Sequence, residues 1–187
     1  MEVLTQKLIN NLIDNNIIKK EDAEIYMYGL NQIVFVTLNL ITTIFIGLAF
    51  NKVFESVLFM VTYIPIRVYA GGYHARTKLR CYIFSVLMLI SVCYILKLNL
   101  LNSYLLIVIL AIIFSGVILY LAPVEDKNKP LDKIEIEVYT KRTIRNLSLV
   151  LIVLCITLIF NKINLSACIC ISLLCNGIML ILGKINN

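Results

Sequence analysis

Long apolar runs alternate with short polar segments over most of the chain. Six runs are almost wholly apolar: 33–50, 53–70, 81–96, 104–122, 147–160 and 165–182. A helix needs about 20 mostly apolar residues to cross the hydrocarbon layer of a bilayer. The pattern therefore predicts an all-α, polytopic membrane protein with six transmembrane helices, forming a single membrane domain over residues 1–187. The shorter runs need a few flanking residues, and the second reaches spanning length only if it includes Pro65 and Arg67.

The N-terminal segment, residues 1–30, has a different pattern. Two apolar series recur every four positions: Leu4, Leu8 and Leu12, and Ile9, Ile13 and Ile17. This periodicity predicts an amphipathic helix over residues 1–20, with its apolar face in the acyl boundary of the membrane interface. A helix packed on another protein surface is the alternative.

The distribution of basic residues predicts how the helices are oriented across the membrane. The formal net charge is +6, which in a soluble protein would suggest nucleic acid, but here the basic residues lie between apolar runs, so we expect no nucleic-acid partner. Fourteen of the 17 Lys and Arg lie in the N-terminal segment, in the gaps after the second and fourth runs, and in the tail. The positive-inside rule then places both termini in the cytoplasm.

The segment from Pro65 to Cys81 holds the candidate chemistry. It contains the single histidine, a Gly-Gly pair and several cations. A thiol is activated as its thiolate by a helix N-terminus and by nearby cations, and Cys81 begins the third run beside Arg76, Lys78 and Arg80. The other cysteines lie inside apolar runs and are expected to be structural: Cys93, Cys155, Cys168, Cys170 and Cys175.

His74 is the candidate base for Cys81. On one continuous helix the two residues would be two turns apart, about 10 Å along the axis, which is too far for a hydrogen bond. Pairing therefore requires the chain to bend, and Gly71 and Gly72 free the backbone just before His74. Three residues of the next basic loop could orient the imidazole, and the sequence does not choose among them: Asp126, Asn128 and Asp132.

Arg67, Lys127 and Lys129 are further cations for which the sequence allows more than one role. Arg67 lies at the end of the second run, where it could bind a substrate carboxylate, orient a loop, or extend to the membrane interface. Lys127 and Lys129 lie in the loop after the fourth run, where they could bind an acidic partner. The positive-inside rule alone would also explain them.

These residues resemble a known family. Arg67, the run from Ala70 to Ala75 and Cys81 at this spacing look like the AgrB family of Gram-positive quorum-sensing systems. Ala122-Pro123-Val124 followed by Lys129-Pro130-Leu131 is also similar to a pattern in that family, and the likeness covers essentially the whole chain. The resemblance implies a membrane-embedded cysteine endopeptidase with an AgrD-like propeptide as substrate. It also implies that His74 and Cys81 are the catalytic pair, and that Arg67 and Gly72 are functional positions.

We therefore expect cleavage of the C-terminal part of the propeptide through an acyl-enzyme thioester, with the resemblance implying thiolactone cyclisation. We expect the protein in the cell membrane of a Gram-positive bacterium, with the active site on the cytoplasmic side. We expect no cofactor or metal, and the protein could form a homodimer. The expected supporting residues are Arg67, Gly71, Gly72, Arg76, Lys78, Lys127 and Lys129. The alternatives are a small transporter that uses Arg67 and Glu55 as pathway groups, and a non-catalytic scaffold.

Overall fold

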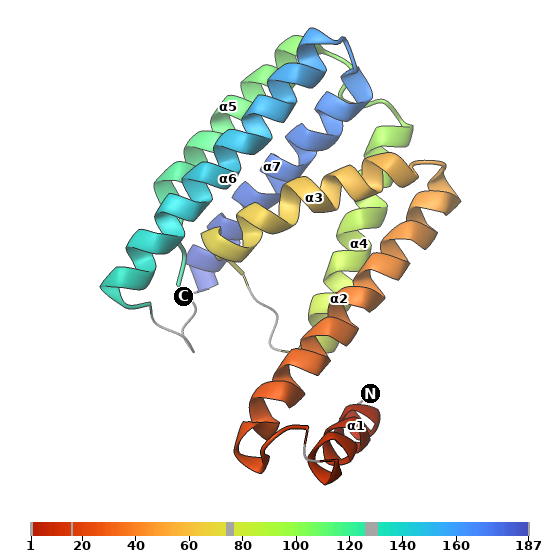
Figure 1. Ribbon diagram of the computed structural model, residues 1–187. Coiled ribbons are helices and arrows are strands. Elements are labelled where there is room, and N and C mark those ends of the chain that lie inside the picture. The colour runs from red at the N-terminus through yellow and green to blue at the C-terminus, as the bar shows by residue number, and fades with distance from the viewer. Residues whose placement is uncertain (1, 16, 74–76, 126–130, 187) are drawn as a thin grey trace. The chain divides into compact units, whose positions relative to one another are not determined.

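The chain is all-α, as predicted. The computed structural model describes residues 2–15, 17–73, 77–125 and 131–186. Within these ranges, helices are joined by turns and loops, and the β-structure consists of one parallel bridge between Gly71 and Val124 (Figure 1). The helices are α1 (Glu2–Asp14), η1 (Lys20–Asp22), α2 (Ala23–Phe50), α3 (Val53–Ala70), α4 (Lys78–Lys97), α5 (Tyr104–Leu121), α6 (Lys133–Ile159) and α7 (Ile163–Asn186).

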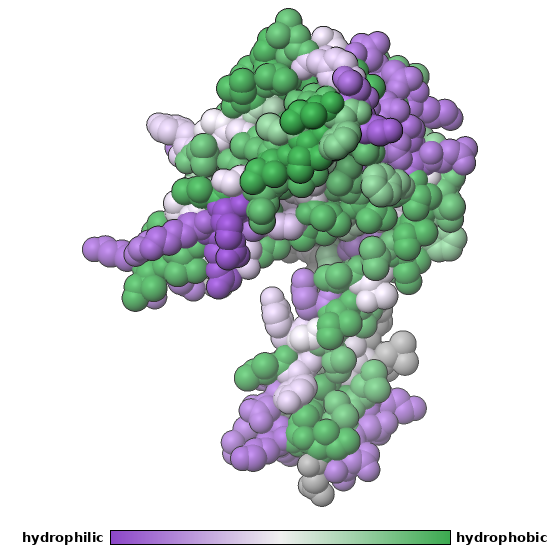
Figure 2. Space-filling model, turned by 45° about the horizontal axis from the view of Figure 1, so that its top comes forward, coloured by the Kyte–Doolittle hydropathy of each residue, from purple (hydrophilic) through white to green (hydrophobic). Residues whose placement is uncertain are grey.

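In the part of the chain that the structure describes, six helices, α2 to α7, are long and apolar enough to cross a membrane, which confirms the predicted number of spans. Both α2 and α6 begin well before their apolar runs at 33–50 and 147–160. Many large apolar side chains are exposed, and they cover much of the face seen in Figure 2. Such a surface is stable in a bilayer but not in water. The protein is therefore a multi-pass membrane protein, while the orientation of its termini stays a prediction.

The chain forms two compact units, Met1–Thr42 and Thr43–Asn187. In the first unit, α1 is a helix where the four-residue periodicity predicted one, and Ile9 on it is buried. Thr5 Oγ1 donates a hydrogen bond to Asn31 Oδ1 at 3.2 Å, which ties α1 to α2 within this unit. The placement of α1 in the membrane interface stays a prediction.

Helix α7 is the centre of the second unit. It packs against α3, α4, α5 and α6, and 67% of its most apolar stretch is buried, against 22–33% for α3 to α6. Its buried residues include a series of small side chains: Ser166, Ala167, Cys168, Cys170 and Ser172. Small residues let helix backbones approach closely, which is how helices associate where lipid removes the hydrophobic driving force.

The second unit has two unlike ends. The tight-turn end consists of residues 51–52, 98–103 and 160–162, and the long-loop end consists of the connections that join α3 to α4 and α5 to α6. Each tight turn contains an asparagine with a positive φ: Asn51 (55°), Asn99 (50°) and Asn161 (54°). Asparagine tolerates this left-handed conformation better than most residues. The long-loop end lies near the C-terminus of the chain (Figure 1).

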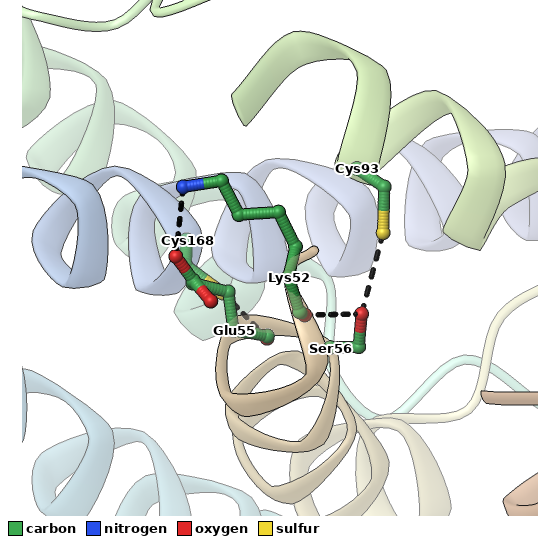
Figure 3. Close-up of polar contacts among 5 residues, drawn as sticks. All are labelled: Lys52, Glu55, Ser56, Cys93 and Cys168. Atoms are coloured by element: carbon green, nitrogen blue, oxygen red, sulfur yellow. Dashed lines mark hydrogen bonds and ion pairs between the residues drawn. The ribbon is translucent and has the colours of Figure 1, made fainter. Parts of the chain in front are cut away.

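A polar cluster closes the tight-turn end (Figure 3). Lys52 Nζ is 2.9 Å from Glu55 Oε1, with side chains only 19% and 15% exposed. Ser56 Oγ donates to Lys52 O at 2.8 Å and lies 3.3 Å from Cys93 Sγ, while Cys168 Sγ donates to Glu55 O at 3.1 Å. These contacts join α3 to α4 and α7, so both thiols have the structural role that the sequence predicted.

Candidate active site

The Gly-Gly pair ends α3 after Ala70, as predicted, and both glycines are required by their surroundings. Their φ angles are +74° for Gly71 and +112° for Gly72, a conformation that L side chains rarely adopt. A Cβ on Gly71 would lie 2.2 Å from Val124 O, and one on Gly72 would lie 2.7 Å from Met179 O. Neighbouring backbone therefore occupies the space that any side chain would need.

Residues Gly71–Tyr73, here called the Gly-Gly segment, are held by three parts of the long-loop end. Val124 N donates to Ala70 O at 2.9 Å, beside the parallel bridge between Gly71 and Val124. Tyr73 N donates to Met179 O of α7 at 2.9 Å. Arg67 of α3 donates to the carbonyls of Gly71 and Tyr73. The backbone is thus fixed up to the residue that precedes His74.

Arg67 makes the contacts expected of a residue that orients a loop. Arg67 is half-buried, and its acceptors are two carbonyls of the Gly-Gly segment. The planar fork of an arginine suits two neighbouring acceptors, which a single ammonium group cannot match. Of the three readings of Arg67, orientation of a loop therefore agrees best with the observed contacts.

Two buried asparagines hold α3 next to Arg67. Asn146 Nδ2 of α6 donates to Pro65 O at 2.7 Å, and Asn176 Nδ2 of α7 donates to Tyr63 O at 3.4 Å. Pro65 has no N–H and so weakens the helical hydrogen bonding of α3 at this point. These contacts were not foreseen. The available signal was a polar side chain inside or beside an apolar run, which is costly at membrane depth unless it has a partner.

Cys81 lies in the first turn of α4, as predicted. The N-cap is Thr77, whose backbone is extended and whose side chain accepts from Arg80 N at 3.3 Å. Cys81 N donates to Thr77 O at 3.0 Å, and the Cys81 residue is only partly buried. Cys81 therefore lies at the N-terminal, positive end of the α4 dipole.

Tyr63 lies one turn before Arg67 on α3. Its side chain is buried, and its backbone carbonyl accepts from Asn176 Nδ2 of α7. Sequence inspection missed Tyr63, because a tyrosine within an apolar run carries no sign of its tertiary neighbours.

Several predicted site residues lie outside the described residues: His74, Arg76, Asp126, Lys127, Asn128 and Lys129. The side chain of Lys78 is likewise not described. Since α3 ends at Ala70 and α4 starts at Lys78, His74 and Cys81 do not share one continuous helix, so the two-turn separation does not apply. Pairing of the two side chains stays a prediction. Asp132, an expected orienter of His74, forms the N-terminal capping box of α6 with Glu135.

The described residues give little support to a metal site or to a transport pathway. Within them, no group of three or more His, Cys, Asp or Glu residues could hold a metal ion. Glu55, a pathway group of the transporter alternative, is paired with Lys52, and Arg67 is engaged with backbone carbonyls. These contacts lend that alternative no support.

Comparison with known proteins agrees with the arrangement of helices and motifs. The sequence model of the AgrB family, accessory gene regulator B, matches residues 5–180. Putative AgrB-like protein 2 of Clostridium perfringens (strain 13 / Type A) is 26% identical over 136 residues, which cover 70% of this chain and 62% of that protein. Putative AgrB-like protein of Clostridium perfringens (strain SM101 / Type A) is 26% identical over 139 residues, with the same two shares.

The chain thus spans 62% of the length of these curated relatives. No solved structure matches it. The family match includes the Gly-Gly segment, Cys81 and all six apolar helices, nearly to the end of α7. The chain belongs to the AgrB family.

Proposed function

We propose that this protein is a membrane-embedded cysteine endopeptidase that cleaves an AgrD-like propeptide. The observation that carries the proposal is the arrangement at the long-loop end. The backbone is fixed up to Tyr73, and Cys81 lies in the first turn of a helix that starts after an extended Thr77. His74 therefore follows an anchored residue, and Cys81 sits at the positive end of a helix dipole.

In the proposed first step, His74 accepts the proton of the Cys81 thiol, or holds the thiolate as an ion pair. The thiolate attacks a carbonyl carbon near the C-terminal part of the propeptide. His74 then donates the proton to the leaving amine, and the C–N bond breaks. The products are an acyl-enzyme thioester on Cys81 and a free C-terminal fragment.

Backbone amides at the start of α4 stabilise the oxyanion in this mechanism. The first four amides of a helix have no partner within the helix. Thr77 Oγ1 already accepts from one of them, Arg80 N, while Cys81 N forms the first regular helical hydrogen bond, to Thr77 O. The amides of Lys78 and Leu79 are then the donors for the developing charge, an arrangement that removal of a single donor can weaken by a factor of about 100 to 1,000.

The second step transfers the acyl group. His74 accepts the proton of a substrate cysteine thiol, the resulting thiolate attacks the thioester carbonyl to form a new C–S bond, and the bond to Cys81 breaks, which restores the Cys81 thiolate beside the protonated His74. Because one thioester replaces another, the exchange is close to thermoneutral and uses no ATP or metal. The product is a thiolactone ring, the outcome that membership of the family suggests.

The substrate is held by charge and by the membrane. Arg76, Lys78, Lys127 and Lys129 supply cations that suit an acidic propeptide tail, each contributing on the order of 1 kcal/mol at low salt. The active site faces the cytoplasm of a Gram-positive bacterium in this proposal, and two copies of the chain form a homodimer. An amphipathic substrate lying on the same membrane would have a raised local concentration beside Cys81.

The test is covalent capture. The purified protein in nanodiscs is incubated with a candidate propeptide, and mass spectrometry searches for the acyl adduct and the released C-terminal fragment. We expect the adduct on Cys81 and its loss in Cys81→Ser. Cys155→Ser is the matched control, because Cys155 is also accessible but lies within the apolar run of α6.

Two results would contradict the proposal. The first is cleavage that persists in Cys81→Ser, and the second is an adduct that forms on Cys155 instead. A transporter or scaffold predicts no adduct and full tolerance of Cys81→Ser. Binding of the propeptide to Cys81→Ala should persist and weaken as salt is raised, and an affinity independent of salt would contradict the electrostatic part.

A further inference from the structure

Gly183, near the end of α7, packs directly against the Gly-Gly segment. A Cβ on Gly183 would lie 2.6 Å from the Cα and carbonyl carbon of Gly72 and 2.6 Å from Tyr73 N. Carbon atoms in ordinary contact are about 3.5–4.0 Å apart. The bare backbone of Gly183 is therefore what allows Gly72 and Tyr73 to approach α7 this closely.

Gly72 in turn packs closely against α7, and a hydrogen bond joins the Gly-Gly segment to α7 one helical turn before Gly183. Met179 lies four residues before Gly183 and thus on the same face of α7. Its carbonyl accepts from Tyr73 N at 2.9 Å and lies 2.7 Å from the position that a Cβ on Gly72 would take. Two glycines, one on each element, therefore let the segment lie flat against the last turns of α7.

We propose that Gly183 is a positioning residue for the cleavage reaction. The inference rests on the proposed function, since Gly183 acts on His74 only through the Gly-Gly segment. Tyr73 precedes His74 directly, so the place where Tyr73 rests on α7 sets the starting point of the imidazole relative to Cys81. A misplacement of about 1 Å in a catalytic group can lower a rate about 100-fold.

The chain offers a matched control for a methyl group added to a membrane helix. Gly116 of α5 has no heavy atom within 4 Å of its Cβ position, so Gly116→Ala fills open space. Gly183→Ala must move the backbone of Gly72 and Tyr73 or of α7 itself. Both substitutions replace a glycine of a candidate membrane-spanning helix by the same residue, and they differ in what the methyl group meets.

The first experiment compares propeptide cleavage by wild type, Gly183→Ala and Gly116→Ala in nanodiscs. We expect Gly183→Ala to lower kcat about 100-fold with KM within about twofold, and Gly116→Ala to keep wild-type values. The pH profile of Cys81 alkylation by iodoacetamide, followed on the Cys81 peptide, is the second readout. A thiolate paired with His74 reacts at a pH below the ordinary thiol pKa of about 8.5, and Gly183→Ala should move the midpoint up toward that value.

Hydrogen exchange of the Tyr73 amide in the wild type tests the proposal even if the Gly183→Ala variant does not fold. In wild type, the Tyr73 amide should exchange at least about tenfold more slowly than an unstructured amide, because it is bonded to Met179 O. Rapid exchange there would overturn the proposal without any variant. A folded Gly183→Ala with wild-type kcat and alkylation profile would also overturn it and leave the proposed function standing. Absence of cleavage and of any adduct in wild type would instead refute the proposed function, and with it this role of Gly183.

Discussion

The two ends of α3 each hold a cation, but the cations have different partners. At the tight-turn end, Lys52 pairs with the carboxylate of Glu55, so the two charges cancel. At the long-loop end, Arg67 donates to carbonyls of the Gly-Gly segment. Neutral acceptors satisfy the hydrogen bonds of a guanidinium but leave its positive charge in place.

This difference separates a structural cluster from a candidate active site. The ion pair of Lys52 and Glu55 joins two residues at the start of the same helix and, because its charges cancel, adds little net field. A guanidinium bonded to neutral oxygens orders a loop and also keeps a positive charge at this end of α3. We therefore expect substitutions at the long-loop end to impair cleavage, and substitutions at the tight-turn end to affect only stability.

The largest effect is expected for Arg67→Lys. An ammonium group keeps the charge but cannot bridge the carbonyls of Gly71 and Tyr73 in the way a planar fork does. We expect kcat for propeptide cleavage to fall about 100-fold, because the anchored backbone before His74 loosens. Steady-state cleavage in nanodiscs measures this. The same variant should exchange the Tyr73 amide faster, and activity equal to wild type would show that charge alone is required.

Gly71→Ala should come next. The new side chain would have to adopt a φ near +74° and would meet Val124 O at 2.2 Å. Backbone strain of this kind costs about 1–3 kcal/mol, so we expect a lower unfolding midpoint together with a fall in kcat smaller than that of Arg67→Lys. Gly29→Ala is the control, since its Cβ meets nothing within 4 Å. Equal behaviour of the two variants would mean that the bridge to Val124 does not restrain the site.

The sequence predicted most of the helices because the bilayer imposes its own length and polarity on each span. It also predicted the end of α3 at Gly71 and the position of Cys81 at a helix start, since both depend on local residues. The contact between Gly72 and Gly183 could not be predicted, because a glycine in a membrane-spanning helix looks the same in the sequence whether it meets lipid or backbone. Asn176 was missed for a related reason, since its partner on α3 is far away in the chain.

Glu55→Gln tests the tight-turn end. The Lys52 ammonium, only 19% exposed, would lose its carboxylate, and we expect the protein to lose about 2 kcal/mol of stability while kcat stays unchanged. Unfolding in mixed detergent micelles measures the first quantity and cleavage measures the second. The double variant Lys52→Met/Glu55→Gln should regain much of the loss, because an apolar pair can replace a buried ion pair. A fall in kcat in the folded single variant would make this end part of the active site.

The smallest effect is expected in the tight turn at Asn161. Its φ of 54° costs most L residues about 1 kcal/mol, which asparagine partly avoids and glycine avoids completely. Asn161→Ala should therefore lower stability by about 1 kcal/mol, whereas Asn161→Gly should stay within about 0.5 kcal/mol of wild type. Both should keep full cleavage, since the turn contributes only geometry at the end away from Cys81. Loss of cleavage by a folded Asn161→Ala would mean that backbone strain at Asn161 changes the positions of Met179 and Gly183 at the other end of α7. The tight-turn end and the long-loop end would then be coupled rather than independent.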